Sequence, residues 1–150
     1  MRPVLVSIDV PQAREVVYDF LDVLSNHERF TSHFMTDWQY QGPDRGVGAK
    51  ARVKATAGGR SQIVDIEVID AERPERNVER NISAGGRRVG TGTYRLAALP
   101  DGGTRVTFEY AWLKAPWNER LGAPIARAVL RRGNERSLQG LAAEMQNLKA

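Results

Sequence analysis

The sequence GTGTYRLAALPDGGTRVTFEYAW, residues 90–112, decides the fold class of this chain. Apolar and polar residues alternate on either side of the run PDGG at 100–103, whose residue types favour a tight turn. Alternation of this kind predicts two half-buried β-strands, and the short turn makes them antiparallel neighbours. Residues 90–112 therefore predict a hairpin with one face toward a core and the other toward water.

The same period of two continues from this hairpin back to residue 36. Short Gly-rich or polar connections separate the alternating segments, and such connections join strands that are antiparallel and adjacent. A weaker alternation near the N-terminus adds one more strand. The expected strands are 4–10, 36–42, 48–57, 60–71, 77–84, 87–99 and 104–114, which form a seven-stranded antiparallel meander.

Helical spacing of apolar residues follows the first strand. Apolar residues over 11–24 predict a first helix, which Pro11 fits as the first residue. Ser25 and Glu28 have the spacing of a capping box, so a second short helix is expected from there through Phe34. Two short helices should therefore follow the first strand.

The C-terminal segment 117–148 predicts one long helix, because its apolar residues form a stripe at helical spacing. Pro124 and Gly133 interrupt this stripe. Proline starts or kinks a helix and an interior glycine weakens it, so we expect a bend in the first third. The order of elements predicts an α+β fold in which a curved sheet wraps around this helix.

The alternation assigns one face of the sheet to the core. This face combines aromatic side chains with very small residues such as Gly90 and Gly92. Glycine inside a strand commonly marks a close approach to the backbone, so the small residues favour space between sheet and helix. The alternative is a solid core that aromatic side chains fill. The residues expected to face inward are Trp38, Tyr40, Ala49, Ala51, Val53, Ala55, Val64, Ile66, Val68, Val78, Arg80, Ile82, Tyr94, Leu96, Val106, Phe108, Tyr110 and Trp112, and those expected to face water include Lys50, Arg52, Glu67, Glu79, Asn81 and Arg105.

Composition excludes several classes of protein. The 150 residues include no cysteine, which excludes disulfides and thiolate chemistry. No segment has the roughly 20 apolar residues that a membrane span needs. The net charge of +4 comes from arginines scattered among 18 acidic residues, which argues against nucleic acid or an anionic membrane surface as a partner. We expect one domain over residues 1–150, soluble and cytoplasmic.

Three local stretches resemble those of a known superfamily. Residues IDVP at 8–11 lead into EVVYDFL at 15–21, GVGA at 46–49 enters a strand, and GTYRL at 92–96 precedes the hairpin residues GGTRV at 102–106. Together with the element order, they resemble the helix-grip fold of the START-like (SRPBCC) superfamily, in particular its polyketide cyclase/dehydratase branch. The resemblance implies a ligand cavity between the long helix and the concave sheet, with the short helices and hairpin loops at its mouth.

Arg80 is the most informative residue for this cavity. Strict alternation through Val78, Arg80 and Ile82 places its guanidinium on the apolar face, where an unpaired charge is costly. Three placements would satisfy this charge. Arg80 pairs with an acid, or it reaches the cavity and holds the polar end of a ligand, or a small register shift turns it outward. The residues expected to line the cavity are Trp38, Tyr40, Ile66, Arg80, Tyr94, Phe108, Tyr110 and Trp112, with His33 and Phe34 at its mouth.

The sequence predicts neither a catalytic constellation nor a metal site. His27 and His33 are the two histidines, and neither has a carboxylate placed to orient it for nucleophilic catalysis. We expect both at the surface or at the cavity mouth. Two poorly spaced histidines without cysteine do not form a metal-ligand set, so we expect neither a metal nor a cofactor.

These features predict that a monomer or homodimer binds or carries a hydrophobic small molecule, aromatic, polyketide-like or lipid-like. One alternative is an enzyme of the polyketide cyclase or dehydratase type, in which Arg80 and a tyrosine polarise a carbonyl. A second alternative is a module that grips another protein, in the manner of co-chaperone relatives. We expect no contact with nucleic acid and no integral membrane contact.

Overall fold

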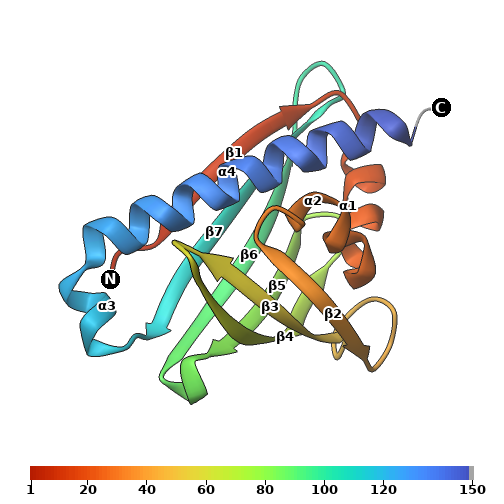
Figure 1. The fold of residues 1–150 in the computed structure, drawn as a ribbon. Coiled ribbons are helices and arrows are strands. Elements are labelled where there is room, and N and C mark those ends of the chain that lie inside the picture. The colour runs from red at the N-terminus through yellow and green to blue at the C-terminus, as the bar shows by residue number, and fades with distance from the viewer. Residues whose placement is uncertain (149–150) are drawn as a thin grey trace.

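Figure 1 shows the computed structural model, which describes residues 1–148. Seven antiparallel strands form one sheet in the order β1-β7-β6-β5-β4-β3-β2, and α4 lies across its inner face. The predicted α+β architecture, a curved antiparallel sheet around a long C-terminal helix, is confirmed. The elements are β1 (Val4–Val10), α1 (Arg14–Asp22), η1 (Leu24–His27), α2 (Glu28–Thr31), β2 (Met35–Gln41), β3 (Lys50–Ala57), β4 (Arg60–Glu72), β5 (Arg76–Ser83), η2 (Ala84–Gly86), β6 (Arg88–Ala98), β7 (Thr104–Lys114), α3 (Trp117–Leu121) and α4 (Ala123–Asn147).

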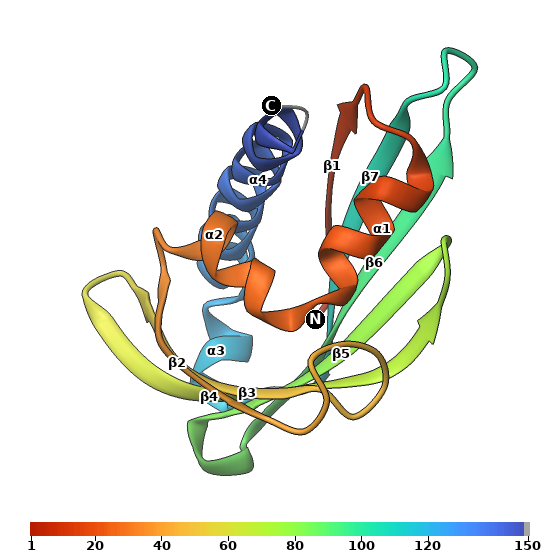
Figure 2. The same cartoon turned by 90° about the vertical axis from the view of Figure 1, so that its right-hand side faces the viewer.

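The sheet bends strongly along its width. Figure 2, turned by 90°, shows α4 foreshortened, with β1, β7 and β6 rising on one side while β2, β3 and β4 lie below the helices. α4 buries Leu138, Leu141 and Met145 in the cluster that β1, β6 and β7 form with α1. The short helices lie between α4 and the rising strands, so the concave face is covered along much of its length.

The short helices after α1 do not begin with the capping box that the sequence predicts at Ser25. Ser25 lies inside the 3₁₀ helix η1 and caps nothing, because η1 already begins at Leu24. The backbone N–H of Leu24 donates to Asp44 O at 3.2 Å, which fixes this start from outside the segment. Asn26 Nδ2 donates to Phe20 O at 2.9 Å and holds the turn between the two helices. A contact with a distant loop thus overrides the local capping signal.

The C-terminal helix is divided near its start. α3 ends at Leu121, Gly122 has non-helical dihedral angles, and Pro124 lies in the first turn of α4, where its missing N–H needs no partner. The expected bend is therefore a break two residues before the proline, while α4 continues through Gly133. No helix within residues 1–148 is both long and apolar enough to cross a membrane.

Most strands present the predicted face to the core. Val53, Ile66, Val68, Leu96, Val106 and Phe108 are all buried as expected. Lys50, Arg52 and Arg105 are exposed as expected, whereas Glu67, which was also expected to be exposed, is half-buried beside Arg80.

β5 is the exception, and its predicted faces are wrong. Asn77, Glu79, Asn81 and Ser83 point inward and are buried, whereas Val78, Arg80 and Ile82 are only half-buried on the outer face. The reason is the register with β4, which shifts between Val68 and Asp70 so that Glu79 pairs with Val68. The extra residue reverses the side of the sheet to which each β5 side chain points.

Candidate functional site

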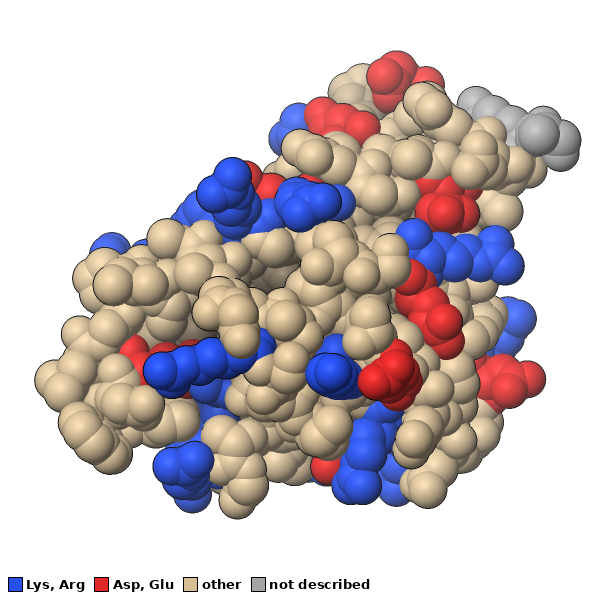
Figure 3. Space-filling view, in the orientation of Figure 1, with Lys and Arg blue, Asp and Glu red and all other residues tan. Residues whose placement is uncertain are grey.

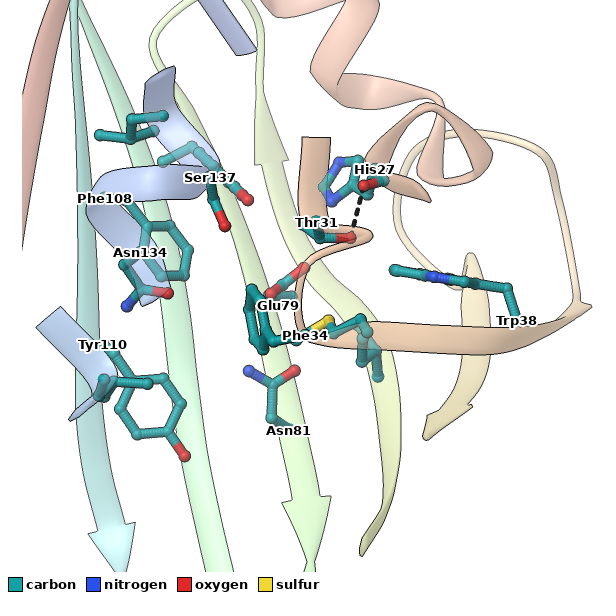
Figure 4. A pocket seen from close by; sticks show the side chains of 15 residues that line it. His27, Thr31, Phe34, Trp38, Glu79, Asn81, Phe108, Tyr110, Asn134 and Ser137 are labelled. Carbon is teal, nitrogen blue, oxygen red and sulfur yellow. Dashed lines mark hydrogen bonds between the residues drawn. The ribbon is translucent and has the colours of Figure 1, made fainter. Parts of the chain in front are cut away.

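A cavity of about 60 Å³ lies between α4 and the middle of the sheet. Apolar side chains of one core cluster, on β6, β7 and α4, form one wall, and Ile66 of the second cluster, on β4, lines the cavity together with Met35 and Trp38, which pack against that cluster. The space-filling view shows a hollow below α4, beside the α2–β2 connection (Figure 3). The lining residues, most of them labelled in Figure 4, are His27, Thr31, Phe34, Met35, Trp38, Ile66, Glu79, Asn81, Tyr94, Phe108, Tyr110, Leu130, Asn134, Ser137 and Leu138.

Two glycines of β6 allow aromatic rings to form the wall beside β5. Gly92 pairs with Tyr110 of β7 and Gly90 with Trp112, and the rings of Phe108 and Tyr110 lie over the glycine backbone. A Cβ atom on Gly92 would lie 2.8 Å from Phe108 Cζ, and one on Gly90 would overlap the Tyr110 hydroxyl. The close approach predicted for these glycines is confirmed, and the groups that approach are these two rings.

Polar side chains from β5 and α4 meet inside this otherwise apolar space. Glu79 and Asn81 point into the cavity from β5, and Asn134 and Ser137 reach it from α4 (Figure 4). Glu79 Oε2, Asn81 Oδ1 and Asn134 Nδ2 are buried and have no hydrogen-bond partner among the described residues. Unpaired polar atoms in an apolar environment are destabilising, each by roughly 1–3 kcal/mol. Trp38 Nε1, also in the lining, is a further buried donor without a partner, so the lining residues have two unpartnered acceptors and two unpartnered donors.

Glu79 is the ionisable carboxyl of the cavity. Only 6% of the residue is exposed, and burial raises the pKa of its carboxyl from 4.5 to about 7, an effect that the neighbouring Asn81 partly offsets. Within the described part of the chain, no lysine or arginine side chain lines the cavity to stabilise the carboxylate. Near neutral pH, Glu79 therefore exchanges between a neutral acid that donates a hydrogen bond and an anion that accepts one.

His27 lines the cavity from η1 and is buried, which corrects the expectation of a surface or mouth position. Its Nε2 lies 2.7 Å from Leu21 O, and because a carbonyl only accepts, this nitrogen carries the proton. Burial lowers the pKa of the imidazole from 6.5 to about 4 and outweighs the opposing effect of that hydrogen bond. His27 is therefore neutral at physiological pH.

The wall opposite α4 is the more exposed part of the lining. Phe34, Met35 and Trp38, around the start of β2, are half-buried, and the ladder with β3 shifts register between Thr36 and Gln39. Asp37, within this bulge, has a φ of 56°. The cavity of about 60 Å³ has room for a few water molecules, whereas pockets for small molecules measure roughly 300–1,000 Å³. A larger ligand therefore needs this wall to move outward.

Six of the residues that the sequence places in or beside the cavity do line it. They are Trp38, Ile66, Tyr94, Phe108 and Tyr110, together with Phe34, which was expected at the mouth. Tyr94 and Tyr110 are buried, and burial raises the pKa of both phenols, that of Tyr110 to about 12. Neither ionises near neutral pH.

Arg80 does not belong to this group, and the expectation that it anchors a ligand in the cavity is wrong. Its Nη2 donates to Glu67 Oε1 at 3.1 Å on the outer face of the sheet, and 41% of its side chain is exposed. The register shift in β4 explains this placement. The cavity accordingly contains a buried carboxyl where the sequence analysis expected a cation.

The remaining expected residues lie beside the cavity and do not line it. Tyr40 is stacked on Trp38 at the sheet edge, is 42% exposed and donates a hydrogen bond to Glu28. Trp112 packs against Tyr110, farther along β7. His33 Nε2 donates to Gly133 O at 2.9 Å and connects the start of β2 to α4, next to the lining residues Asn134 and Ser137.

The sequence pattern does not reveal the polar half of the site. Glu79 and Asn81 were assigned to the outer face, and nothing singled out Thr31, Asn134 or Ser137. One signal was present on α4, where Asn134 and Ser137 have the spacing of a helical face that also carries the apolar Leu138 and Leu141. Polar residues on the buried stripe of a helix indicate either internal hydrogen bonds or a binding site.

Similarity to known proteins extends over nearly the whole chain. The family model described as "Polyketide cyclase / dehydrase and lipid transport" matches residues 1–146. No curated protein sequence matches the chain. Among solved structures, the protein TTHA0849 from Thermus thermophilus is similar with a TM-score of 0.77 at 20% identity, covering 99% of this chain and 100% of the other.

Two further structures show how widely the fold is used. DynU16, a protein of the dynemicin biosynthetic locus, has a TM-score of 0.66 at 19% identity, over 96% of this chain and 47% of its own. Ara h 8.0201 has a TM-score of 0.61 at 11% identity, over 94% of this chain and 98% of its own. At these identities the structures share a fold with this chain, and they carry no information about its ligand.

Proposed function

Because the chain belongs to the polyketide cyclase/dehydrase and lipid transport family of the START-like superfamily, we propose that it binds an apolar small molecule between α4 and the sheet. We further propose that this molecule carries an uncharged hydrogen-bonding group, such as a phenol, alcohol or carbonyl. The observation that carries the proposal is the set of buried, unpartnered polar atoms of Glu79, Asn81 and Asn134, which face one apolar cavity.

The energetics of these atoms support a ligand with one polar group. A hydroxyl both donates and accepts hydrogen bonds. It can therefore accept from Asn134 Nδ2 and donate to either Glu79 Oε2 or Asn81 Oδ1. The ring or chain of such a ligand would contact Phe108, Tyr110 and Leu130. Removing these apolar surfaces from water would stabilise the complex. Binding therefore removes the cost of unpaired polar atoms and adds apolar contact.

The charge of the site opposes an anionic ligand. Glu79 is the charged group of the lining when ionised, and the neighbouring Arg80 points to the other face, toward Glu67. A ligand carboxylate would lie beside Glu79 without a cation to balance it, and burying an unpaired charge is strongly unfavourable. The cavity therefore favours neutral ligands over fatty acids and other carboxylates.

Binding of 1-naphthol and 1-naphthoic acid, measured by titration calorimetry at pH 7.5, tests this function. The two probes share their rings and differ in the polar group, and we expect naphthol to bind at least about tenfold more tightly. Glu79→Leu should weaken naphthol binding about fivefold to a hundredfold, the range for a lost buried hydrogen bond. Arg80→Met, on the outer face, is the matched control and should leave both affinities unchanged.

Two outcomes would count against the proposal. Tighter binding of naphthoic acid, lost in Arg80→Met, would show that a cation anchors the ligand after all. Failure of both probes, together with no small molecule in native mass spectra of protein purified from its own host, would show that the cavity is unoccupied packing space.

A second candidate, a polyketide cyclase or dehydratase, is favoured by the pKa of Glu79. A carboxyl with a pKa of about 7 is suited to proton transfer at neutral pH. Its carboxylate would take a proton from a carbon next to a carbonyl, the resulting carbanion would attack a second carbonyl, and the new alkoxide would take the proton back. Ring closure that is abolished in Glu79→Gln, while naphthol binding is retained, would favour this activity over simple binding.

A further inference from the structure

The first half of the C-terminal helical region has an apolar face that no part of the described chain covers. Trp117 is 73% exposed, Leu121 77%, Ile125 73% and Val129 45%. Their spacing of four residues runs from α3 into α4, and Leu113 at the end of β7 adds a further side chain that is 65% exposed. Large apolar patches of this kind on a folded protein mark a surface that contacts something else.

An excess of positive charge lies on the same segment. Residues 113–132 hold five of the 22 basic residues and one of the 18 acidic residues, which leaves the remainder of the chain with no net charge. The five are Lys114, Arg120, Arg127, Arg131 and Arg132. Other stretches carry a similar excess, since residues 45–64 hold five basic and no acidic residues, so the basic residues are distributed along the chain as expected.

The contacts of these arginines leave their charge uncompensated. Arg127 donates to the carbonyl oxygens of Arg2 and Pro3, and Arg131 donates to Leu5 O at 3.0 Å. Several arginines elsewhere pair with carboxylates, as Arg105 does with Asp9 at 2.8 Å. A carbonyl orients a guanidinium without neutralising it, so the segment keeps its positive charge.

The one acid of the segment has a structural role. Glu119 of α3 pairs with Arg88 of β6 at 2.7 Å, and both side chains are more than four-fifths buried. This ion pair fixes α3 on the end of the sheet and removes the carboxylate from the exposed face. In Figure 3, the end of the molecule where α3 and the first turns of α4 lie is mainly uncharged, with Lys or Arg atoms along α4.

We propose that the exposed face of α3 and the first turns of α4, which we call the α3–α4 face, docks on the surface of an anionic lipid bilayer. Apolar side chains flanked by basic ones insert among lipid headgroups while the basic groups attract anionic lipids. Trp117 suits such an interface because its ring is amphipathic. The excess of positive charge favours anionic lipid over a second copy of this chain, whose identical face would repel it. The cavity lining begins one residue beyond Val129, at Leu130, so the docked face adjoins the proposed binding site.

Co-sedimentation of the full chain with vesicles tests this proposal without any cavity ligand. We expect binding to vesicles of phosphatidylcholine with about 30% phosphatidylserine and little binding to phosphatidylcholine alone, with the difference decreasing as salt is raised. Trp117→Glu should abolish binding. Arg131→Gln with Arg132→Gln should weaken it about twenty-fivefold, since each basic residue contributes about fivefold.

Matched variants lie on other elements, outside this face. Val47→Glu changes a 59%-exposed apolar residue in the β2–β3 loop, and Lys50→Gln with Lys54→Gln removes two exposed charges from β3. Both controls should bind vesicles like the unmodified protein, and thermal unfolding should show all variants folded. Equal loss in the controls, or no preference for anionic lipid, would overturn the proposal. So would a dimer in solution that Trp117→Glu converts to a monomer, because a second copy would then cover the face.

Discussion

At the scale of single residues, β5 determines the chemistry of the interior. Its inward side chains are all polar, so two apolar clusters meet there without merging into one core. Glu79 is the most consequential of these residues, because it is ionisable and lacks a nearby cation in the lining. His27 is also buried in the lining, and its pKa is displaced in the opposite direction.

The shifted pKa values of Glu79 and His27 predict opposing effects of pH on the free energy of unfolding. The pKa of Glu79 is raised from 4.5 to about 7. Its contribution to the free energy of unfolding is therefore full below pH 4.5 and is lost as pH rises toward 7. The pKa of His27 is lowered from 6.5 to about 4, so its contribution is full above pH 6.5 and is lost as pH falls toward 4. Between pH 4.5 and 6.5 the two effects should nearly cancel in the unmodified protein.

Single variants should reveal each slope. In Glu79→Gln the free energy of unfolding should rise with pH across this window by about 2–3 kcal/mol, and in His27→Gln it should fall by a similar amount. Glutamine at 27 can still donate to Leu21 O, so the titration is removed with little other change. Urea unfolding at several pH values measures both slopes. Parallel curves for the three proteins would show that neither residue titrates as described.

Gly92 offers a second test at the residue scale. In Gly92→Ala the new Cβ would lie 2.8 Å from Phe108 Cζ and 3.0 Å from Glu79 Oε1, so a ring must shift within a packed interior. We expect the free energy of unfolding to fall by about 1–3 kcal/mol. Gly133→Ala is the control, because no atom lies within 4 Å of its Cβ position in α4, and it should stabilise the protein by about 0.5–1 kcal/mol. An unchanged stability for Gly92→Ala would mean that the aromatic wall is mobile.

At the scale of elements, α4 covers the inner face of the sheet. Its buried residues Leu138, Leu141 and Met145 all lie in its second half, while the first half carries the exposed α3–α4 face. The helix thus combines two functions along its length, a core-forming part and a part open to a partner. Asn134 and Ser137 lie at the boundary, where the cavity is.

Removal of residues from 123 onward should leave a chain that aggregates. The truncation deletes α4 and exposes the apolar inner face of β1, β6 and β7 to water. Size-exclusion chromatography and circular dichroism would measure the outcome. A soluble monomer with an unchanged strand signal would show that the sheet is stable without its helix.

At the scale of the whole molecule, the curved sheet brings together residues that are far apart in the chain. His27, Glu79 and Asn134 come from η1, β5 and α4, yet all three line one cavity. The lining also includes the half-exposed wall at the start of β2. The fold therefore joins a buried polar site to a more exposed apolar wall.

The sequence by itself determined the elements, their order and the inward faces of most strands. The reason is that these properties depend on periods of two or 3.6 residues and on turn residues, all of which are local. The hairpin of β6 and β7 follows directly from residues 90–112, and the close approach at Gly90 and Gly92 follows from the absence of their side chains.

Only the tertiary structure decided which face of β5 is buried and hence which polar groups line the cavity. The alternation of Val78, Arg80 and Ile82 is as regular as that of Glu79 and Asn81, so the local pattern permits either face. The bulge in β4 between Val68 and Asp70 sets the choice, because one extra residue reverses every side chain that follows in the ladder. Pairing across strands, and not the pattern within β5, therefore placed Arg80 on the outer face and Glu79 inside.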